Sequence, residues 1–222
     1  MKAIRVLIVW GSETNCTKNV ITEISDGWKA DGKIKVVKVI EGDAISGEFD
    51  QINSSNYDAL IVATSSYGDG DPPAGFGKFL YKLYEASKDG EEPFAGMQHA
   101  VLGLGSTTYE TYQNVPRLVD KLIGEAGSKR CLKRVEVDEI DDDNEETIKK
   151  WSDEVVKAIG EVPGATPVCD WTEPADEIYD KVLGEDGFEV AQGMAAESSN
   201  VKLAIVVAAL GAGYFYYKKY IK

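Results

Sequence analysis

Ala63-Thr64-Ser65-Ser66-Tyr67-Gly68-Asp69-Gly70-Asp71-Pro72-Pro73 is the stretch that decides how the rest of the chain is interpreted. It follows residues 59–62, a short apolar run that is typical of a buried strand. Its glycines and prolines predict a rigid loop that presents Tyr67 and leaves backbone accessible beside it. In open parallel sheets, ligands bind at the carboxyl ends of strands. An ordinary strand-to-helix connection with a partly buried tyrosine is the alternative for this loop alone.

Residues 1–160 alternate between short apolar runs and helical patterns. We expect strands at about 3–9, 33–40, 57–63, 99–104 and 130–137, with helices ending near residues 30, 87, 126 and 159. This alternation predicts an α/β fold with a doubly wound, five-stranded parallel sheet. In the order 2-1-3-4-5 the chain reverses between strands one and three, so loops 11–17 and 64–73 flank the reversal and loop 105–113 lies next to them.

The loop after the first expected strand, residues 11–17, reads Gly-Ser-Glu-Thr-Asn-Cys-Thr. It places hydroxyl groups, and an Asn15 that tolerates a left-handed backbone, at the start of a helix. Hydroxyls and free amides at a helix amino end can hold a phosphate without lysine or arginine. Plain N-capping by serine or threonine is the alternative. No Gly-Lys-Ser/Thr follows, so this is not a Walker P-loop.

The loop after the fourth expected strand, residues 103–113, is again rich in glycine and hydroxyl groups and carries Tyr109. It lacks the third glycine of a dinucleotide-binding fingerprint. One phosphate-type loop with two tyrosines around it suits a single flat ring that bears a phosphate, such as FMN. The acidic run 138–143 precedes the last expected helix, where carboxylates favour the helix dipole, and Asn144 is expected to cap that helix.

Composition excludes several classes of function. The net charge of -14 argues against nucleic acid and favours partners with a basic face. Cys16, Cys131 and Cys169 are odd in number and form no C-x-x-C motif, which argues against a disulfide framework or zinc site and suggests a reducing compartment. With His99 as the one histidine, a Ser-His-Asp triad or multi-histidine metal site is not expected.

Taken together, these motifs resemble the flavodoxin-like family, and most closely the FMN-binding domain of cytochrome P450 reductase and related diflavin reductases. The resemblance covers about residues 4–160. It rests on the loops at 12–17, 65–72 and 103–110, and on Trp151, which stands where the last helix of the family often carries tryptophan.

The resemblance implies FMN as the cofactor and gives each loop a role. Residues 12–17 would hold the phosphate, and Tyr67 and Tyr109 would stack on opposite faces of the isoalloxazine. The Gly68 carbonyl would meet N5 of the one-electron-reduced ring, and residues 104–106 would line its polar edge. The cofactor-binding set implied in this way is Ser12, Glu13, Thr14, Asn15, Cys16, Thr17, Ser65, Ser66, Tyr67, Gly68, Asp69, Gly70, Leu104, Gly105, Ser106, Thr107, Thr108, Tyr109, Gln113 and Glu139, with no catalytic or metal-binding residue.

Two residues depart from the family pattern. Asn15 stands where glycine is usual, and asparagine can adopt the same backbone. Cys16 stands where threonine or asparagine is usual, and a thiol donates a weaker hydrogen bond, which would lower phosphate affinity. No long insertion splits the fifth strand, so the short-chain form is expected. Nothing after residue 160 resembles an FAD/NADPH module, so we do not expect this chain itself to accept hydride from NADPH.

The chain after the predicted flavodoxin-like domain, residues 1–160, divides into three parts. Residues 161–200 are acidic and proline-containing, which predicts a linker. A transmembrane tail anchor is expected at 201–218, followed by a basic tail at 219–222. The uncharged core of this anchor, residues 203–217, would span about 22 Å as a helix. That is short of the ~30 Å hydrocarbon layer, but flanking lysines can snorkel. A buried core helix is the alternative.

Without an amino-terminal signal segment, the flavin domain is expected to face the cytosol from an outer mitochondrial, plastid or ER membrane. The leading hypothesis is a membrane-tethered, FMN-dependent one-electron carrier. It would pass electrons from a separate NAD(P)H-linked flavoprotein reductase to a membrane-bound redox acceptor with a basic docking face. The alternatives are an NAD(P)H:quinone reductase of flavodoxin-like fold and a flavin-free binding module on this fold. The chain is thus expected to be an electron-transfer flavoprotein rather than a self-sufficient oxidoreductase.

Overall fold

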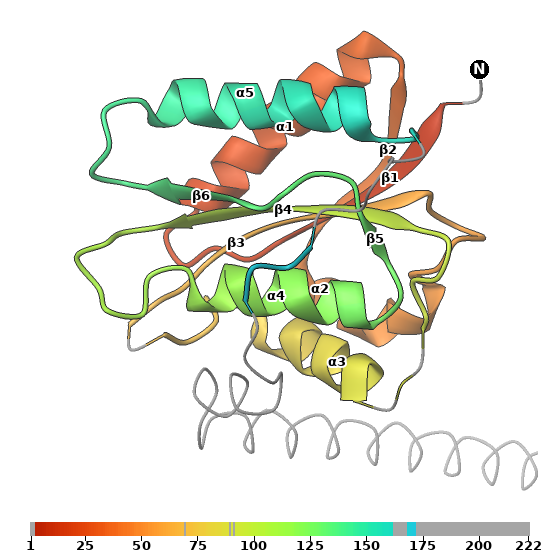
Figure 1. Cartoon of the computed structure of the whole chain (residues 1–222), viewed down its shortest axis with the longest axis horizontal. Helices are drawn as coiled ribbons and strands as arrows, with labels where there is room; N and C mark the ends of the chain where they lie inside the picture. Colours follow the sequence, from red (N-terminus) through yellow and green to blue (C-terminus); the bar gives the residue numbers. More distant parts are fainter. Residues whose placement is uncertain (1–2, 69, 89, 91, 162–167, 172–222) are drawn as a thin grey trace, which may run out of the picture. The chain divides into compact units, whose positions relative to one another are not determined.

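The computed structural model describes residues 3–68, 70–88, 90, 92–161 and 168–171, so the predicted membrane anchor lies outside the described residues. Strands and helices alternate along the chain (Figure 1). They are β1 (Ile4–Trp10), α1 (Cys16–Asp31), β2 (Ile34–Glu41), α2 (Gly42–Ile45), the 3-10 helix η1 (Ser46–Gln51), β3 (Ala59–Ser65), α3 (Gly77–Lys88), β4 (Gln98–Gly105), α4 (Asn114–Glu125), β5 (Lys129–Arg130), β6 (Val135–Asp138) and α5 (Asn144–Ala158). No helix in these described ranges is both long and apolar enough to cross a membrane.

The sheet is parallel throughout and has the order β2-β1-β3-β4-β5, with β6 also paired to β4. The predicted order 2-1-3-4-5, which puts the second strand at an edge, is therefore confirmed.

The prediction of a single fifth strand at 130–137 is wrong in one respect, because the structure has two strands there, β5 and β6, with an interruption between them. Four residues lie between Arg130 and Val135, whereas two lie between their partners His99 and Leu102 on β4. The surplus residues cannot stay in register, so the chain leaves the ladder and rejoins it.

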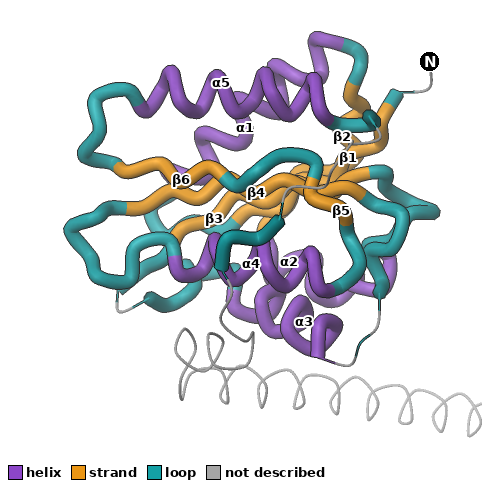
Figure 2. Tube along the Cα trace, in the orientation of Figure 1, coloured by secondary structure: helices purple, strands orange, loops and turns teal. Residues whose placement is uncertain are grey.

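Helices cover both faces of the sheet, with α1 and α5 on one side and α2, α3 and α4 on the other (Figure 2). Because successive side chains of a strand point to opposite faces, β1 serves both layers. Its Leu7 and Val9 belong to the core under α3 and α4, and its Val6 and Ile8 belong to the core under α1 and α5. All four are fully buried, as expected for a central strand of a parallel sheet.

A buried ionic cluster joins α4 to the interrupted edge. Asp120 accepts hydrogen bonds from Arg130 Nε at 2.7 Å and from Arg134 Nη1 at 2.8 Å, and the three side chains are at most 6% exposed. His99 Nε2 lies 3.4 Å from the Asp120 carboxylate. Burial alone would raise the pKa of Asp120, but His99 and Arg130 hold that pKa below its ordinary value.

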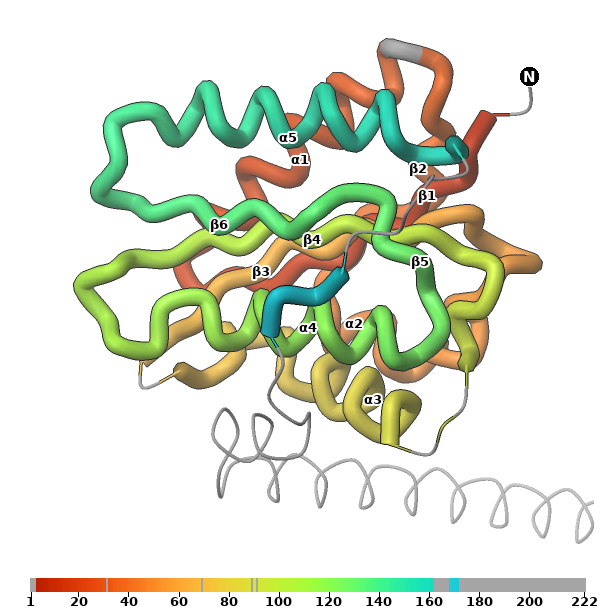
Figure 3. Tube along the Cα trace, in the orientation of Figure 1, coloured from red at the N-terminus to blue at the C-terminus, as the bar shows by residue number. Residues whose placement is uncertain are grey.

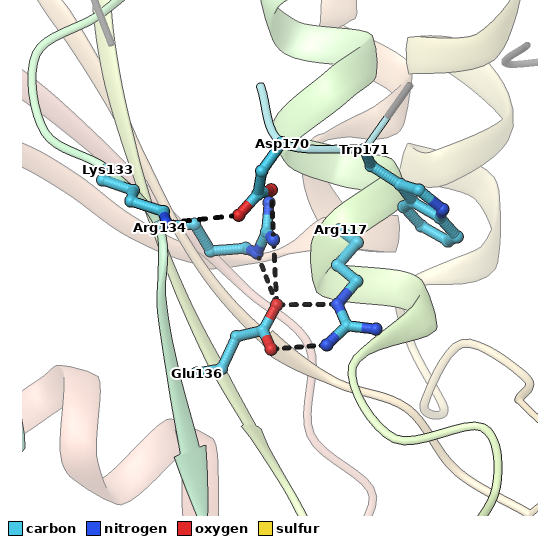
Figure 4. Close-up of a pocket in the computed structure, with 6 residues that line it drawn as sticks. All are labelled: Arg117, Lys133, Arg134, Glu136, Asp170 and Trp171. Atoms are coloured by element: carbon cyan, nitrogen blue, oxygen red, sulfur yellow. Dashed lines mark hydrogen bonds and ion pairs between the residues drawn. The ribbon is translucent and has the colours of Figure 1, made fainter. Parts of the chain in front are cut away.

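Residues 168–171 pack against this same edge (Figure 3). Asp170 accepts a hydrogen bond from Arg134 at 2.8 Å and lies 3.4 Å from the Lys133 ammonium (Figure 4). Trp171 packs against the hydrophobic core under α3 and α4, and its carbonyl accepts a hydrogen bond from Lys121 at 3.5 Å. This short segment, inside the predicted linker 161–200, is therefore attached to the domain.

Candidate functional site

The loops that follow β1, β3, β4 and β6 meet at the carboxyl end of the sheet, on the left in Figure 1. They enclose a cavity of about 570 Å³, a usual size for a small-molecule site. The cavity lies where the sheet order reverses between β1 and β3. From the predicted set it brings together Ser12, Glu13, Thr14, Cys16, Thr17, Ser65, Ser66, Tyr67, Gly68, Leu104, Gly105, Ser106, Tyr109, Gln113 and Glu139.

One end of the cavity is the amino terminus of α1. Asn15 is the N-cap residue in a left-handed conformation, with φ 66°, as its sequence predicted. Its side chain makes no capping hydrogen bond, so the alternative of plain side-chain capping is not observed at this helix. The buried hydroxyls of Ser12 and Thr17 line the cavity beside this helix end. Hydroxyls next to uncapped amides are suited to an anion such as a phosphate.

The other end carries two exposed tyrosines from different loops. Tyr67 follows β3 and is 53% exposed, and Tyr109 follows β4 and is 58% exposed. No other aromatic side chain in the described part of the chain is exposed to this degree. Since burial normally stabilises aromatic rings, two solvent-facing rings on one cavity indicate a place for a third, flat ring.

A tight turn sets the direction of Tyr67. The backbone of Tyr67 and Asp71 exchanges two hydrogen bonds of 2.9 and 2.8 Å, and Gly70 also donates to the Tyr67 carbonyl at 2.9 Å. Gly68 and Gly70 have φ of 51° and 111°, a region in which side chains other than glycine are strained. The two glycines of the deciding stretch are therefore required by the turn that presents the ring.

Gln113 closes the floor of the cavity and provides a buried acceptor. It is fully buried, has φ 64°, and donates from Nε2 to the Val137 carbonyl at 3.4 Å. Its Oε1 has no hydrogen-bond partner among the described residues. A Cβ on Gly103 would lie 1.9 Å from that oxygen, so the glycine is what allows the amide to lie there. The protein itself covers this oxygen, so Gln113 shapes the floor of the cavity from behind.

Four predicted residues, Asn15, Gly70, Thr107 and Thr108, do not line the cavity, and Asp69 lies outside the described residues. Two of the four brace the loops instead. The Thr107 amide donates to Asp138 Oδ1 at 3.2 Å, and the Thr108 hydroxyl lies 2.8 Å from that of Ser106. Hydrogen bonds from the side chain of Thr107, and to a lesser extent from its amide, lower the pKa of Asp138 below its ordinary value.

The cavity has further lining residues that the sequence analysis did not propose, namely Val20, Thr111, Tyr112, Val137, Asn144 and Ile148. Asn144 was expected to cap α5, but Asp143 is the N-cap residue, and the side-chain Nδ2 of Asn144 donates to the Asp138 carbonyl at 2.7 Å. Helical spacing could have revealed Val20 and Ile148, because each lies one turn beyond a residue at the start of its helix.

Exposed carboxylates border the cavity. Glu139 lines it and donates its amide to the Gly105 carbonyl at 2.8 Å, and Asp141, Asp142 and Asp143 follow in the same turn. We call these four residues the acidic rim. Glu139 places its negative charge at the cavity wall, and the three aspartates continue that charge along the turn.

These features fit FMN: an uncapped helix end with hydroxyls for its phosphate, and two exposed tyrosines for its flat ring. The three loops predicted from the sequence supply all of them.

Comparisons with known proteins agree. The family model described as Flavodoxin matches residues 8–151. The chain is 30% identical over 161 residues to a bifunctional cytochrome P450/NADPH–P450 reductase of Bacillus cereus, covering 70% of this chain and 14% of that protein. It is 29% identical over 158 residues to a sulfite reductase [NADPH] flavoprotein alpha-component of Mannheimia succiniciproducens, covering 71% and 24%. The chain thus spans less than a quarter of the length of these curated relatives.

Solved structures show the same fold. A flavodoxin from Streptococcus pneumonia TIGR4 superposes with a TM-score of 0.56 and 24% identity, covering 69% of this chain and 98% of that one. A flavodoxin variant from Pseudomonas aeruginosa superposes with a TM-score of 0.57 and 21% identity, covering 71% and 100%. The family and the fit of the cavity identify the cofactor as FMN. The chain belongs to the flavodoxin family.

Proposed function

We propose that this chain is a membrane-tethered, FMN-dependent one-electron carrier. The observation that carries the proposal is the cavity with a phosphate-type helix end on one side and the solvent-facing Tyr67 and Tyr109 on the other. When bound, FMN supplies the one-electron redox chemistry. The residues of the chain hold the phosphate, orient the ring between the tyrosines and leave that end of the cavity open to partner proteins.

The proposed partners are a separate NAD(P)H-linked flavoprotein reductase and a membrane-bound redox acceptor. The printed names of the two curated relatives combine NADPH with P450 or sulfite reduction in much longer proteins. This chain corresponds to a small part of each. One electron would enter from the reductase and one would leave to the acceptor in each cycle.

The acidic rim would act on both potential and docking. Negative charge close to the ring disfavours further negative charge on it, which lowers the potential for full reduction. The same charges would orient partners that present a basic face.

Membrane tethering is proposed from residues 203–217, which lie outside the described residues. We expect the full chain to float with phospholipid vesicles, and a chain that ends at residue 200 to stay in the dense fraction. A tether would raise the effective concentration of acceptors in the same membrane. Equal flotation of both chains would contradict the anchor and leave the flavin proposal unaffected.

The first test of the function is a visible absorption spectrum of the full-length protein, purified in mild detergent, with the released chromophore identified. We expect one FMN per chain. A colourless protein that also fails to take up added FMN would contradict the carrier proposal. Turnover of NADPH with a quinone, without any added protein, would instead indicate an NAD(P)H:quinone reductase of the same fold.

A further inference from the structure

The loop that carries Tyr67 is fastened to the loop that carries Tyr109 by the Thr111 side chain, and to the start of α4 by the Ser66 side chain. The Thr111 hydroxyl donates to the Gly68 carbonyl at 3.3 Å. The Thr111 methyl lies 3.1 Å from where a Cβ on Gly70 would be, so the side chain covers the turn. Ser66 Oγ accepts a hydrogen bond from the Val115 amide at 3.0 Å, at the start of α4.

The turn around Tyr67 is also held from its other side. Glu13 Oε2, from the loop after β1, accepts a hydrogen bond from the Ala74 amide at 2.8 Å. The Tyr67 loop therefore has protein contacts to the loops on both flanks. Of these contacts, only the Thr111 hydrogen bond reaches the turn itself, because its acceptor Gly68 directly follows Tyr67.

We propose that Thr111 is a positioning residue that fixes Tyr67 relative to Tyr109, so that the cavity is preorganised for a flat ring. This inference rests on the proposed flavin function. Gly68 and Gly70 allow wide backbone freedom, which the hydrogen bonds inside the turn and the Thr111 bond together restrict. Ordering such a turn at the moment of binding would reduce affinity, and restraint beforehand avoids that loss.

Loss of the Thr111 hydroxyl should affect binding of the flavin ring and not of the phosphate. A hydrogen bond of this kind changes an equilibrium by about two- to tenfold. Because Thr111 acts on the loop between the rings and not on the phosphate end, its loss should weaken binding of FMN and of riboflavin, which lacks the phosphate, by the same factor. Thr14 lines the phosphate end, so Thr14→Val should weaken FMN binding and leave riboflavin binding unchanged.

The test compares three substitutions in the full-length protein by titration of flavin fluorescence. Thr111→Val removes the hydroxyl with little change of shape, and we expect both flavins to bind about two- to tenfold more weakly. Thr111→Ser keeps the hydroxyl and should restore most of the affinity. Thr22→Val is the matched control, because Thr22 is an exposed residue of α1 whose hydroxyl donates to the Lys18 carbonyl.

A second measurement separates positioning from direct contact with the ligand. In the flavin-free protein, hydrogen exchange at the amides of Tyr67, Gly70 and Asp71 should be faster in Thr111→Val than in wild type, since these amides are bonded within the turn. Unchanged exchange with weaker binding would show that Thr111 only contacts the ligand and would overturn the inference. Unchanged affinity for both flavins would also overturn it. Failure of the wild-type protein to bind either flavin would contradict the proposed function instead.

Discussion

At the scale of single residues, position 11 requires glycine because an aromatic ring lies close to it. A Cβ at this position would lie 2.6 Å from the ring of the fully buried Phe76. We expect Gly11→Ala to destabilise the fold by about 1–3 kcal/mol, because the ring must shift in a closely packed core. Since Ser12 follows directly, FMN affinity should fall as well. Urea unfolding of the flavin-free protein measures the first effect.

Gly27 provides the matched control for that substitution. It lies inside α1 with no atom within 4 Å of its would-be Cβ. Gly27→Ala should therefore stabilise the protein by about 0.5–1 kcal/mol, as expected for alanine in a helix. Changes of the same sign at both positions would contradict the packing argument.

His99 gives a prediction about pH. Burial lowers the pKa of its imidazole below the ordinary value, against the opposing effect of Asp120, and Arg130 lowers it further. Because the folded pKa lies below the unfolded one, the unfolded chain takes up a proton first as the pH falls. The stabilisation is therefore complete above pH ~6.5 and is lost as the pH falls through the folded pKa.

The measurement is direct, because the chain has a single histidine whose ring proton resonances can be followed by NMR. We expect the folded protein to show a midpoint below the unfolded value, and the free energy of unfolding to decrease from pH 7 to pH 5. Carboxylates with a lowered pKa, such as Asp120, act in a separate and lower window, below their unfolded value near 4. A midpoint at or above 6.5 would contradict the burial argument.

At the scale of elements, the strand-helix alternation could be predicted from sequence because both signals are local. The three loops could be predicted for the same reason, since glycine, hydroxyl and aromatic residues stand together just after apolar runs. The break between β5 and β6 could not, because it depends on register against β4. Val20 and Ile148 were missed because apolar residues on a helix face look like core until the neighbouring loops are placed.

The interrupted edge predicts a graded response to loss of charge. Asp120 is 2% exposed and holds two buried guanidinium groups, whereas the Asp170 side chain is 47% exposed. We expect Asp120→Asn to destabilise the fold by about 3–5 kcal/mol, because it removes the buried carboxylate charge that both guanidinium groups contact. Asp170→Asn should cost at most about 1 kcal/mol, because solvent screens that pair.

Urea unfolding at pH 7 would compare these variants with Asp153→Asn, which removes an exposed pair with Lys149 on α5 and should have almost no effect. Equal losses for Asp120→Asn and Asp170→Asn would mean that residues 168–171 stabilise this edge as much as the buried cluster does.

At the scale of the whole molecule, part of the net negative charge lies next to the flavin cavity. The net charge is -14, and the acidic rim borders the cavity that binds FMN. Electrostatic attraction raises association rates over distances of about one Debye length, ~10 Å at 0.1 M salt. Its effect on electron transfer should therefore depend on where the carboxylates lie and not only on how many there are.

We predict that neutralising the rim slows electron transfer to a basic partner more than neutralising other carboxylates does. The rim variant is Glu139→Gln with Asp141→Asn and Asp142→Asn. The control removes the same charge from exposed residues near the amino ends of β3 and β4, by Asp50→Asn, Glu92→Gln and Glu161→Gln.

Stopped-flow oxidation of the reduced protein by a basic c-type cytochrome, from low to high salt, measures the rates. At low salt we expect the rim variant to be about three- to tenfold slower than wild type, with a weaker salt dependence, because steering is lost where the ring is approached. The control variant should lose much less. An equal loss in both variants would show that net charge alone attracts the partner and that the rim does not orient it.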